Sequence, residues 1–254
     1  MKKEKQVVKQ FINVNILFDK DKIHSMMDNY IKKNEVQYIC AINANSITVA
    51  NNDENFKEAV NGAGFNLCDG SLIALTYKMI YKEKVEPYPG PDFFIHYLSQ
   101  KKYKSFFFGS TQELLDSLKE KLQVYDPAIK DMPFYSPPFL PLDEYDYEEM
   151  GKMINESDAD IIWISLGAPK QEVFMQKLKP HLKKGVMVGV GAAFIFYGDE
   201  TRKRAPEIIR KMHLEWLYRI ITTRTFPKRF RNQLLYMPSL LLKEFLKKVK
   251  NNES

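Results

Sequence analysis

Asp69 holds a position in the sequence that suits a catalytic carboxylate. It follows the apolar run 65–68 and precedes Gly70 and a segment with the pattern of a helix. The dipole of such a helix favours an ionised carboxylate, and Gly70 leaves space for a substrate beside it. An ionised aspartate can accept a proton from an attacking hydroxyl group, so Asp69 is a candidate general base. The alternative is a helix N-cap, a role that aspartate often fills at such places.

A second group of polar residues lies at 167–172, after the apolar run 161–166. Gly167 allows close backbone approach, and Pro169 suits the entry to a helix. Lys170 and Gln171 carry donors that can bind phosphate, ribose or a base, and Glu172 follows them. The segment is a candidate binding turn. A plain connection between a strand and a helix would have the same composition.

Other common kinds of site have little support in the sequence. Gly189-Val190-Gly191 resembles part of a dinucleotide-binding fingerprint, but Phe194 stands where its third small residue belongs. There is no Gly-x-Ser-x-Gly elbow and no Walker loop. The histidines share no metal-ligand spacing, and the two cysteines fall in apolar runs as reduced core thiols would, so we expect neither a metal nor a disulfide, and a cytosolic compartment. These residues are His24, His96, His181, His213, Cys40 and Cys68.

The elements that must position these residues alternate between strand and helix. This alternation predicts an α/β fold, a Rossmann-like, mainly parallel sheet with helices on both faces. Ligands bind such sheets at the carboxyl ends of the strands, so 43–48, 69–70 and 167–172 should converge on one cleft. We expect strands at 11–17, 36–41, 65–68, 105–108 and 161–166 and one ending at Gly189, helices at 19–33, 53–61, 71–81, 91–100 and 111–122, and a proline-rich loop at 126–142.

Length and charge divide the chain of 254 residues into two parts. Its net charge is +6, but 201–250 holds 14 Lys and Arg against three Glu, a balance of +11 that leaves −5 for the rest. We therefore expect a catalytic domain at 1–200 and a basic helical appendage at 201–254 that meets phosphates. The basic tail also contains Trp216, Tyr218 and Phe230, so a nucleic-acid-binding module is an alternative, as is a solvated pair of helices.

The end of the tail has the pattern of an amphipathic helix. Leu241, Leu242, Phe245, Leu246 and Val249 fall at helical spacing with lysines beside them, a pattern that can lie in a bilayer interface. Packing on the core or on a subunit partner is the alternative. No signal peptide is expected, and no window reaches the roughly 18 uninterrupted apolar residues that a spanning helix needs.

Eight short motifs, in order from about residue 12 to 231, together resemble the WecG/TagA/CpsF family of bacterial glycosyltransferases, which act in cell-surface polysaccharide synthesis. The motifs are Asn43-Ala44-Asn45-Ser46-Ile47, Cys68-Asp69-Gly70, Pro89-Gly90-Pro91-Asp92, Ser136-Pro137-Pro138-Phe139, Leu166-Gly167-Ala168-Pro169-Lys170-Gln171-Glu172, Gly189-Val190-Gly191-Ala192-Ala193-Phe194, Arg204-Ala205-Pro206 and Leu214-Glu215-Trp216-Leu217-Tyr218-Arg219.

The resemblance implies an inverting transferase that moves a hexose, of N-acetylmannosamine type or related, from a UDP-sugar to a lipid-diphosphate-linked sugar. It would work at the cytoplasmic face of the plasma membrane as a peripheral protein bound to the anionic surface, and a homo-oligomer is compatible with this assignment. The family's proposed base falls on Asp69. No metal or other cofactor is implied, since the tail arginines could stabilise the departing UDP, and no nucleic acid is involved. The implied substrate-binding residues are Asn43, Asn45, Gly90, Asp92, Gly167, Pro169, Lys170, Gln171, Glu172, Gly189, Gly191, Ala192, Arg204, Arg219 and Arg229.

The sequence departs from the family pattern at several of these motifs. Asn43-Ala44-Asn45 stands where many members have Thr-Pro-Asn, and Pro87 and Tyr88 stand where many have an arginine. These two departures bear on the choice of donor or acceptor. Ile195 replaces the usual aspartate, and Thr222-Thr223-Arg224 replaces a Glu-Pro pair, which bears on the assignment of individual tail arginines.

Overall fold

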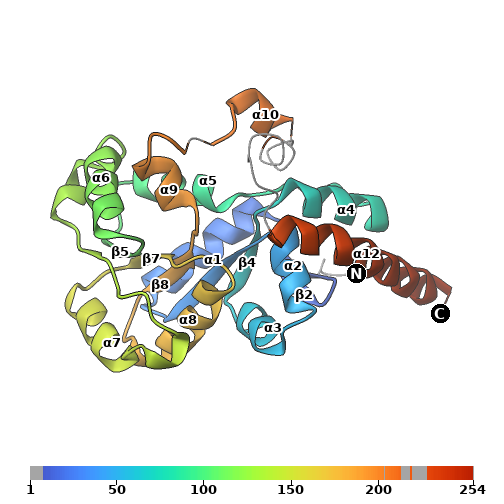
Figure 1. Cartoon of the computed structure of the whole chain (residues 1–254), viewed down its shortest axis with the longest axis horizontal. Helices are drawn as coiled ribbons and strands as arrows, with labels where there is room; N and C mark the ends of the chain where they lie inside the picture. The colour runs from blue at the N-terminus through green and yellow to red at the C-terminus, as the bar shows by residue number, and fades with distance from the viewer. Residues whose placement is uncertain (1–7, 203, 213–217, 219–227, 254) are drawn as a thin grey trace.

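The described residues form an α/β fold around one eight-stranded sheet (Figure 1). The computed structural model describes residues 8–202, 204–212, 218 and 228–253. The strand order is β1-β2-β4-β3-β8-β7-β5-β6, and every pair is parallel except β1 with β2. The strands are β1 (Val8–Phe11), β2 (Val14–Leu17), β3 (Gln37–Ile42), β4 (Phe65–Cys68), β5 (Ser105–Gly109), β6 (Phe134–Tyr135), β7 (Ile161–Ser165) and β8 (Val186–Gly189).

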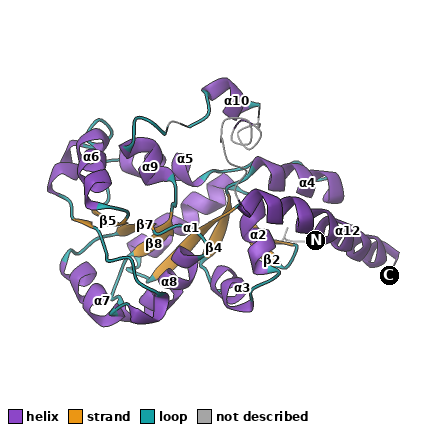
Figure 2. Ribbon diagram, in the orientation of Figure 1, coloured by secondary structure: helices purple, strands orange, loops and turns teal. Residues whose placement is uncertain are grey.

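Helices cover both faces of the sheet (Figure 2), which confirms the predicted fold class. One apolar cluster includes side chains of α2 (Ala44–Ala50), α3 (Glu54–Asn61), α4 (Ser71–Tyr81), α7 (Tyr147–Glu156) and α8 (Lys170–Leu178). The other includes side chains of α1 (Lys20–Lys32), α5 (Gly90–Ser99), α6 (Gln112–Leu122) and α9 (Ala193–Gly198). Short 3-10 turns lie at Pro127–Asp131, Leu142–Glu144 and Lys179–His181.

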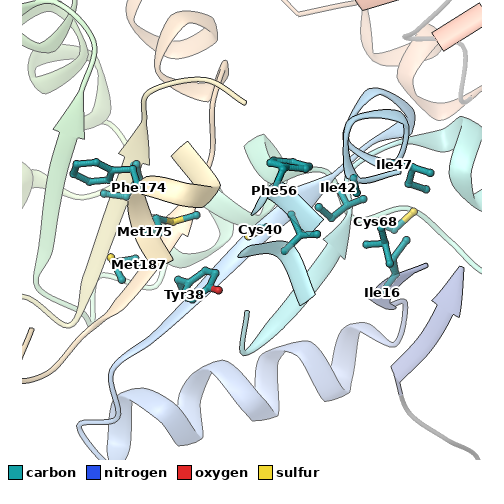
Figure 3. Close-up of a cluster of buried hydrophobic side chains, with 14 of the residues drawn as sticks. Ile16, Tyr38, Cys40, Ile42, Ile47, Phe56, Cys68, Phe174, Met175 and Met187 are labelled. Atoms are coloured by element: carbon teal, nitrogen blue, oxygen red, sulfur yellow. The ribbon is translucent and has the colours of Figure 1, made fainter. Parts of the chain in front are cut away.

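Strand β3 shows why the central strands read as continuous apolar runs. Tyr38, Cys40 and Ile42 belong to the first cluster and Ile39 to the second, so successive side chains pack on opposite helical layers. Figure 3 shows the first cluster, with Phe56 of α3 lying close to the β3 side chains. A strand covered on both faces needs apolar residues at every position, as parallel strands commonly do.

The sequence-based boundaries are wrong in two segments. The expected strand 11–17 is a hairpin, because Ile12 and Asn13 adopt φ values of 48° and 62° and turn β1 back onto β2. No helix was predicted directly after β3, yet these residues enter α2 at once, since Asn43 and Ser46 form a capping box. Helix α7 was not anticipated, and the remaining expected elements lie within about two residues of the observed bounds.

The basic tail contains α10 (Glu207–Lys211) and the long helix α12 (Lys228–Glu253), which continues through Pro238. Helix α12 packs against α2 and α4. Met237 is buried in the first apolar cluster, Tyr81 of α4 donates a hydrogen bond to buried Glu244, and Lys248 Nζ donates to the carbonyl oxygen of Ile80 at 2.6 Å. Helix α12 therefore contributes to the same apolar core as the sheet and its helices.

Candidate active site

The topology indicates that a ligand-binding crevice should lie between the carboxyl ends of β3 and β8. These two strands are neighbours, yet α2 after β3 and α9 after β8 belong to different apolar clusters, on opposite faces of the sheet. Connections that leave adjacent parallel strands toward opposite faces open a crevice at the carboxyl ends of those strands. The polar strand ends singled out in the sequence flank this crevice.

Asp69 contacts the start of α5 instead of capping its own helix. The N-cap of α4 is Gly70, which makes no side-chain capping bond, so the N-cap alternative for Asp69 is wrong. The Asp69 backbone N–H donates to Ile42 O at 2.8 Å, and its Oδ1 accepts a hydrogen bond from the backbone N–H of Gly90 at 2.7 Å. Gly90 is the first residue of α5, and the positive end of that helix favours a carboxylate.

Two glycines allow the strand ends to approach each other. A Cβ atom at Gly90 would lie 3.3 Å from Ala41 Cβ and 4.0 Å from Val190 Cα. A Cβ atom at Gly70 would lie 3.4 Å from Asn43 Cβ. The segments after β3 and β4 therefore meet at Asn43 and Gly70, as predicted, and the start of α5 lies against Ala41 of β3 and Val190 after β8.

Asn43 has a structural task in addition to its predicted contact with substrate. Its Oδ1 accepts hydrogen bonds from the backbone N–H groups of Asn45 and Ser46 at 3.0 and 3.2 Å and so caps α2. Asn45 lies in the first turn of α2 with a partly exposed side chain. The crevice is thus bordered by two helix N-termini, of α2 and α5.

The turn after β7 presents backbone to open space. Gly167 has φ +78°, and no atom of the described residues lies within 4 Å of a Cβ built on it, which leaves its backbone open to a ligand on the side of these residues. The peptide bond between Ala168 and Pro169 is cis. Pro169 forms the N-cap of α8, which begins at Lys170.

Lys170 is turned toward the proline-rich segment. Its Nζ donates to the carbonyl oxygen of Leu140 and to the Tyr145 hydroxyl, the latter at 3.0 Å. The same ammonium lies 4.6 Å from the centre of the Phe139 ring and 4.8 Å from that of Tyr145. The predicted phosphate contact of Lys170 would require it to leave these partners.

Gln171 and Glu172 are buried although they are polar. Their exposed fractions are 4% and 0%, and Gln171 Nε2 donates to Glu172 Oε1 at 2.9 Å. Burial raises the pKa of Glu172 to about 7, against the lowering effect of the hydrogen bonds from Gln171 and from its own backbone N–H. A Cβ at Gly189 would lie 3.0 Å from Gln171 Nε2, so the amide packs against the end of β8.

The loop after β8 is held by a residue that the sequence did not single out. Ser165, the last residue of β7, donates its hydroxyl to the carbonyl oxygen of Gly191 at 2.8 Å. Gly191 has φ +48°, and Ala192 forms the N-cap of α9. Ser165 could have been noticed as a polar residue within the apolar run 161–166, but no sequence signal distinguishes its role.

Two predicted substrate-binding residues pair with each other. Arg204 Nη1 lies 2.6 Å from Asp92 Oδ1, and the Arg204 side chain is only 10% exposed. Arg210 adds a longer approach to the same Asp92 oxygen, at 3.8 Å. Asp92 belongs to the first turn of α5, so the pair fixes the start of the tail beside the crevice. Arg219 and the side chain of Arg229 lie outside the described residues.

Within the part of the chain that the structure describes, no three His, Cys, Asp or Glu side chains gather as a metal site. No helix in this part is long and apolar enough to cross a membrane. The predicted absence of a metal or other cofactor stays a prediction.

Comparison with known proteins assigns the chain to a family. Three bacterial relatives carry the name N-acetylglucosaminyldiphosphoundecaprenol N-acetyl-beta-D-mannosaminyltransferase. The protein of Bacillus spizizenii (strain W23) is 30% identical, over 81% of this chain and 77% of the relative. The protein of Bacillus subtilis (strain 168) is 26% identical, over 94% of this chain and 92% of the relative. The protein of Staphylococcus aureus (strain NCTC 8325) is also 26% identical, over 72% of this chain and 71% of the relative. The model of the glycosyl transferase WecG/TagA/CpsF family matches residues 10–254, and the chain belongs to this family of glycosyltransferases.

Proposed function

We propose that this glycosyltransferase moves N-acetylmannosamine from its UDP-sugar to an N-acetylglucosaminyl diphosphate carried on a polyprenyl lipid. The observation that carries the proposal is the shared name of the three relatives, which specifies this acceptor and this sugar. The matches cover more than two thirds of both chains, and the family model matches residues 10–254, which include the strand ends around the site. The family assignment favours this function over a nucleic-acid-binding module.

The geometry supports Asp69 as the general base of an inverting transfer. In such a reaction the acceptor hydroxyl attacks the anomeric carbon from the side opposite the departing UDP, and a carboxylate takes the hydroxyl proton. The Gly90 N–H holds Asp69 Oδ1, which fixes the carboxylate at the crevice in a defined orientation. The positive ends of α5 and α2 add fixed partial charges on the same side.

The departing UDP needs compensation for its negative charge. Arg204 is the one candidate cation among the three predicted tail arginines whose side chain is described, and Asp92 holds it at the start of α5. We assign Arg204, with Arg219 and Arg229 from the rest of the tail, to the diphosphate. Preorganised cations stabilise charge that develops in the transition state without a reorganisation cost at the moment of reaction.

The exposed side of α12 suits contact with the membrane that carries the lipid acceptor. Leu242, Phe245, Leu246 and Val249 are between 37% and 59% exposed, whereas Leu241 packs on the core. Lysines at 243, 247, 248 and 250 accompany these apolar residues. Apolar side chains and several basic residues together bind an anionic surface reversibly. We place the protein peripherally on the cytoplasmic face of the membrane.

The function is tested by measuring UDP release from a panel of UDP-sugars. UDP-N-acetylmannosamine, UDP-N-acetylglucosamine and UDP-glucose are each offered with a short-chain polyprenyl diphosphate N-acetylglucosamine. We expect release with UDP-N-acetylmannosamine that depends on the acceptor and yields a disaccharide lipid. Faster transfer from another UDP-sugar would contradict UDP-N-acetylmannosamine as the donor. UDP release that is the same with and without the acceptor would contradict the proposed transfer.

A further inference from the structure

The buried pair of Gln171 and Glu172 has two hydrogen-bonding atoms without partners. Gln171 Oε1 and Glu172 Oε2 are both buried and accept no hydrogen bond from any described residue. Buried polar atoms are almost always satisfied, so such a pair calls for a ligand, a water or a function. The pair lies under the 189–191 segment, where a Cβ at Gly191 would lie 3.8 Å from both Gln171 Nε2 and Gln171 Oε1.

The carboxylate determines which way the amide points. An ionised carboxylate only accepts hydrogen bonds, whereas a glutamine amide has a donating end and an accepting end. Glu172 Oε1 therefore holds the NH2 end of Gln171, at 2.9 Å, and the carbonyl end is left for a different partner. Gly189 leaves room for this arrangement, because any side chain there would press on the amide.

We propose that Glu172 is a positioning residue, which locks the Gln171 amide so that its carbonyl oxygen accepts a hydrogen bond from an N–H or O–H group of the sugar nucleotide at the 189–191 loop. The identity of this ligand rests on the proposed function. The partner is either an N–H of the nucleotide base or an amide or hydroxyl group of the sugar, since both offer the same donor chemistry. Glu172 acts through Gln171 and the loop and does not contact the reacting atoms.

The lock depends on the ionised form of Glu172. A protonated Glu172 can itself donate, which removes the preference for the NH2 end of Gln171. The titratable group beside it is Cys40 of β3, and Tyr147 of α7 contacts the ring of Phe174 on the same helix as Glu172. Burial raises the pKa of the Cys40 thiol well above its usual range and that of Tyr147 to about 12, so both stay neutral near pH 7. Helix α3, which also packs on α8, carries Glu54 and Glu58 on its exposed side.

The first test measures binding of UDP and of UDP-N-acetylmannosamine by calorimetry in the parent and in Glu172→Gln. With a carboxyl pKa of about 7, the ionised fraction falls about tenfold from pH 8 to pH 6, and we expect the parent's affinity to fall by up to the same factor. Glu172→Gln should bind about tenfold more weakly at pH 8, and its affinity should lack this pH step. Glu58→Gln, which removes an exposed carboxylate from the neighbouring helix, is the matched control and should behave as the parent.

The two ligands distinguish the source of the hydrogen bond. A loss with UDP alone places the Gln171 carbonyl at the nucleotide, and a loss only with UDP-N-acetylmannosamine places it at the sugar. Equal affinities and equal pH profiles in the parent and in Glu172→Gln, with both proteins folded by circular dichroism, would overturn the positioning role.

The second test needs no ligand, so it separates the lock from the proposed function. The side-chain amide signals of Gln171 are identified in nitrogen-15 spectra by their absence from Gln171→Leu. In the parent they should shift with a midpoint at a pH of about 7, and in Glu172→Gln they should not. Amide signals that do not change with pH in the parent would refute the positioning of Gln171 by Glu172, even if transfer is observed. A protein that shows the shift but binds no UDP-sugar would refute the proposed function alone.

Discussion

Glu172 should reduce the stability of the protein at neutral and alkaline pH. Its carboxyl group has a usual pKa of 4.5 and, because of burial, a pKa of about 7 in the folded protein. Between these values the folded protein holds a proton that the unfolded chain has released. The free energy of unfolding is therefore highest below the unfolded pKa and falls as the pH rises to the folded pKa. A difference of about 2.5 units at 1.36 kcal/mol each amounts to at most about 3 kcal/mol.

Glu172→Gln isolates this contribution, because glutamine keeps the size and polarity of the neutral acid. We expect the variant to match the parent near pH 4.5 and to be more stable at pH 8, by up to about 3 kcal/mol. Urea unfolding at several pH values, followed by the fluorescence of buried Trp163, measures the difference. Burial lowers the pKa of His24, which has the opposite effect on stability, but both proteins share His24 and it cancels.

Two results would refute this reasoning. One is a stability difference between variant and parent that stays constant from pH 5 to pH 8, and the other is a difference that shrinks as the pH rises. Either would mean that Glu172 is ionised in the folded protein at acidic pH, in spite of its complete burial. The Glu58→Gln protein provides the baseline for loss of an exposed carboxylate.

Four further predictions follow from the site and the tail. Asp69→Asn should bind UDP normally but transfer about 100-fold to 10,000-fold more slowly, and near-normal turnover would remove Asp69 from the role of base. Gln171→Ala should weaken binding of the UDP-sugar more than that of the acceptor, and unchanged donor affinity by calorimetry would contradict its placement. Gly109→Ala should lower the unfolding free energy by about 2–4 kcal/mol, because φ is +115° and the new Cβ would lie 2.4 Å from the Ser165 carbonyl oxygen; a melting temperature equal to the parent's would count against this strain. The double variant Phe245→Ser and Leu246→Ser should keep its fold but sediment less with anionic liposomes, whereas unchanged sedimentation, or loss of a dimer in its place, would argue for another partner.

The location of the site could be predicted because it depends on backbone topology. Apolar runs that end in Asn43, Asp69 and Gly167 identify parallel strands, and their carboxyl ends share one edge of the sheet. The helix after β3 was missed although Asn43 and Ser46 have the spacing of a capping box. The hairpin at Ile12 and Asn13 has no glycine to mark its positive φ values.

The partners of individual side chains could not be predicted, because they depend on packing between distant segments. Asp92 and Arg204 are 112 positions apart, and each was expected to face the substrate before the structure paired them. Lys170 was expected at a phosphate, but Leu140 and Tyr145 supply it with closer acceptors. Glu172 looked like one more polar residue of a binding turn, and only its complete burial reveals a different task.

Helix α12 carries two separate sets of residues along its length, and the angular spacing of the helix keeps them apart. Met237, Leu241 and Glu244 face the body, while Leu242 and Leu246 face outward. Substitutions within the outward set can therefore change binding to the membrane surface without lowering the stability of the fold. An insertion of one residue after Pro238 would instead turn everything beyond it by about 100°. That single change would turn Lys243 into the buried position of Glu244 and Glu244 into solvent. Relatives of this protein should therefore tolerate substitutions in α12 far better than changes in its length.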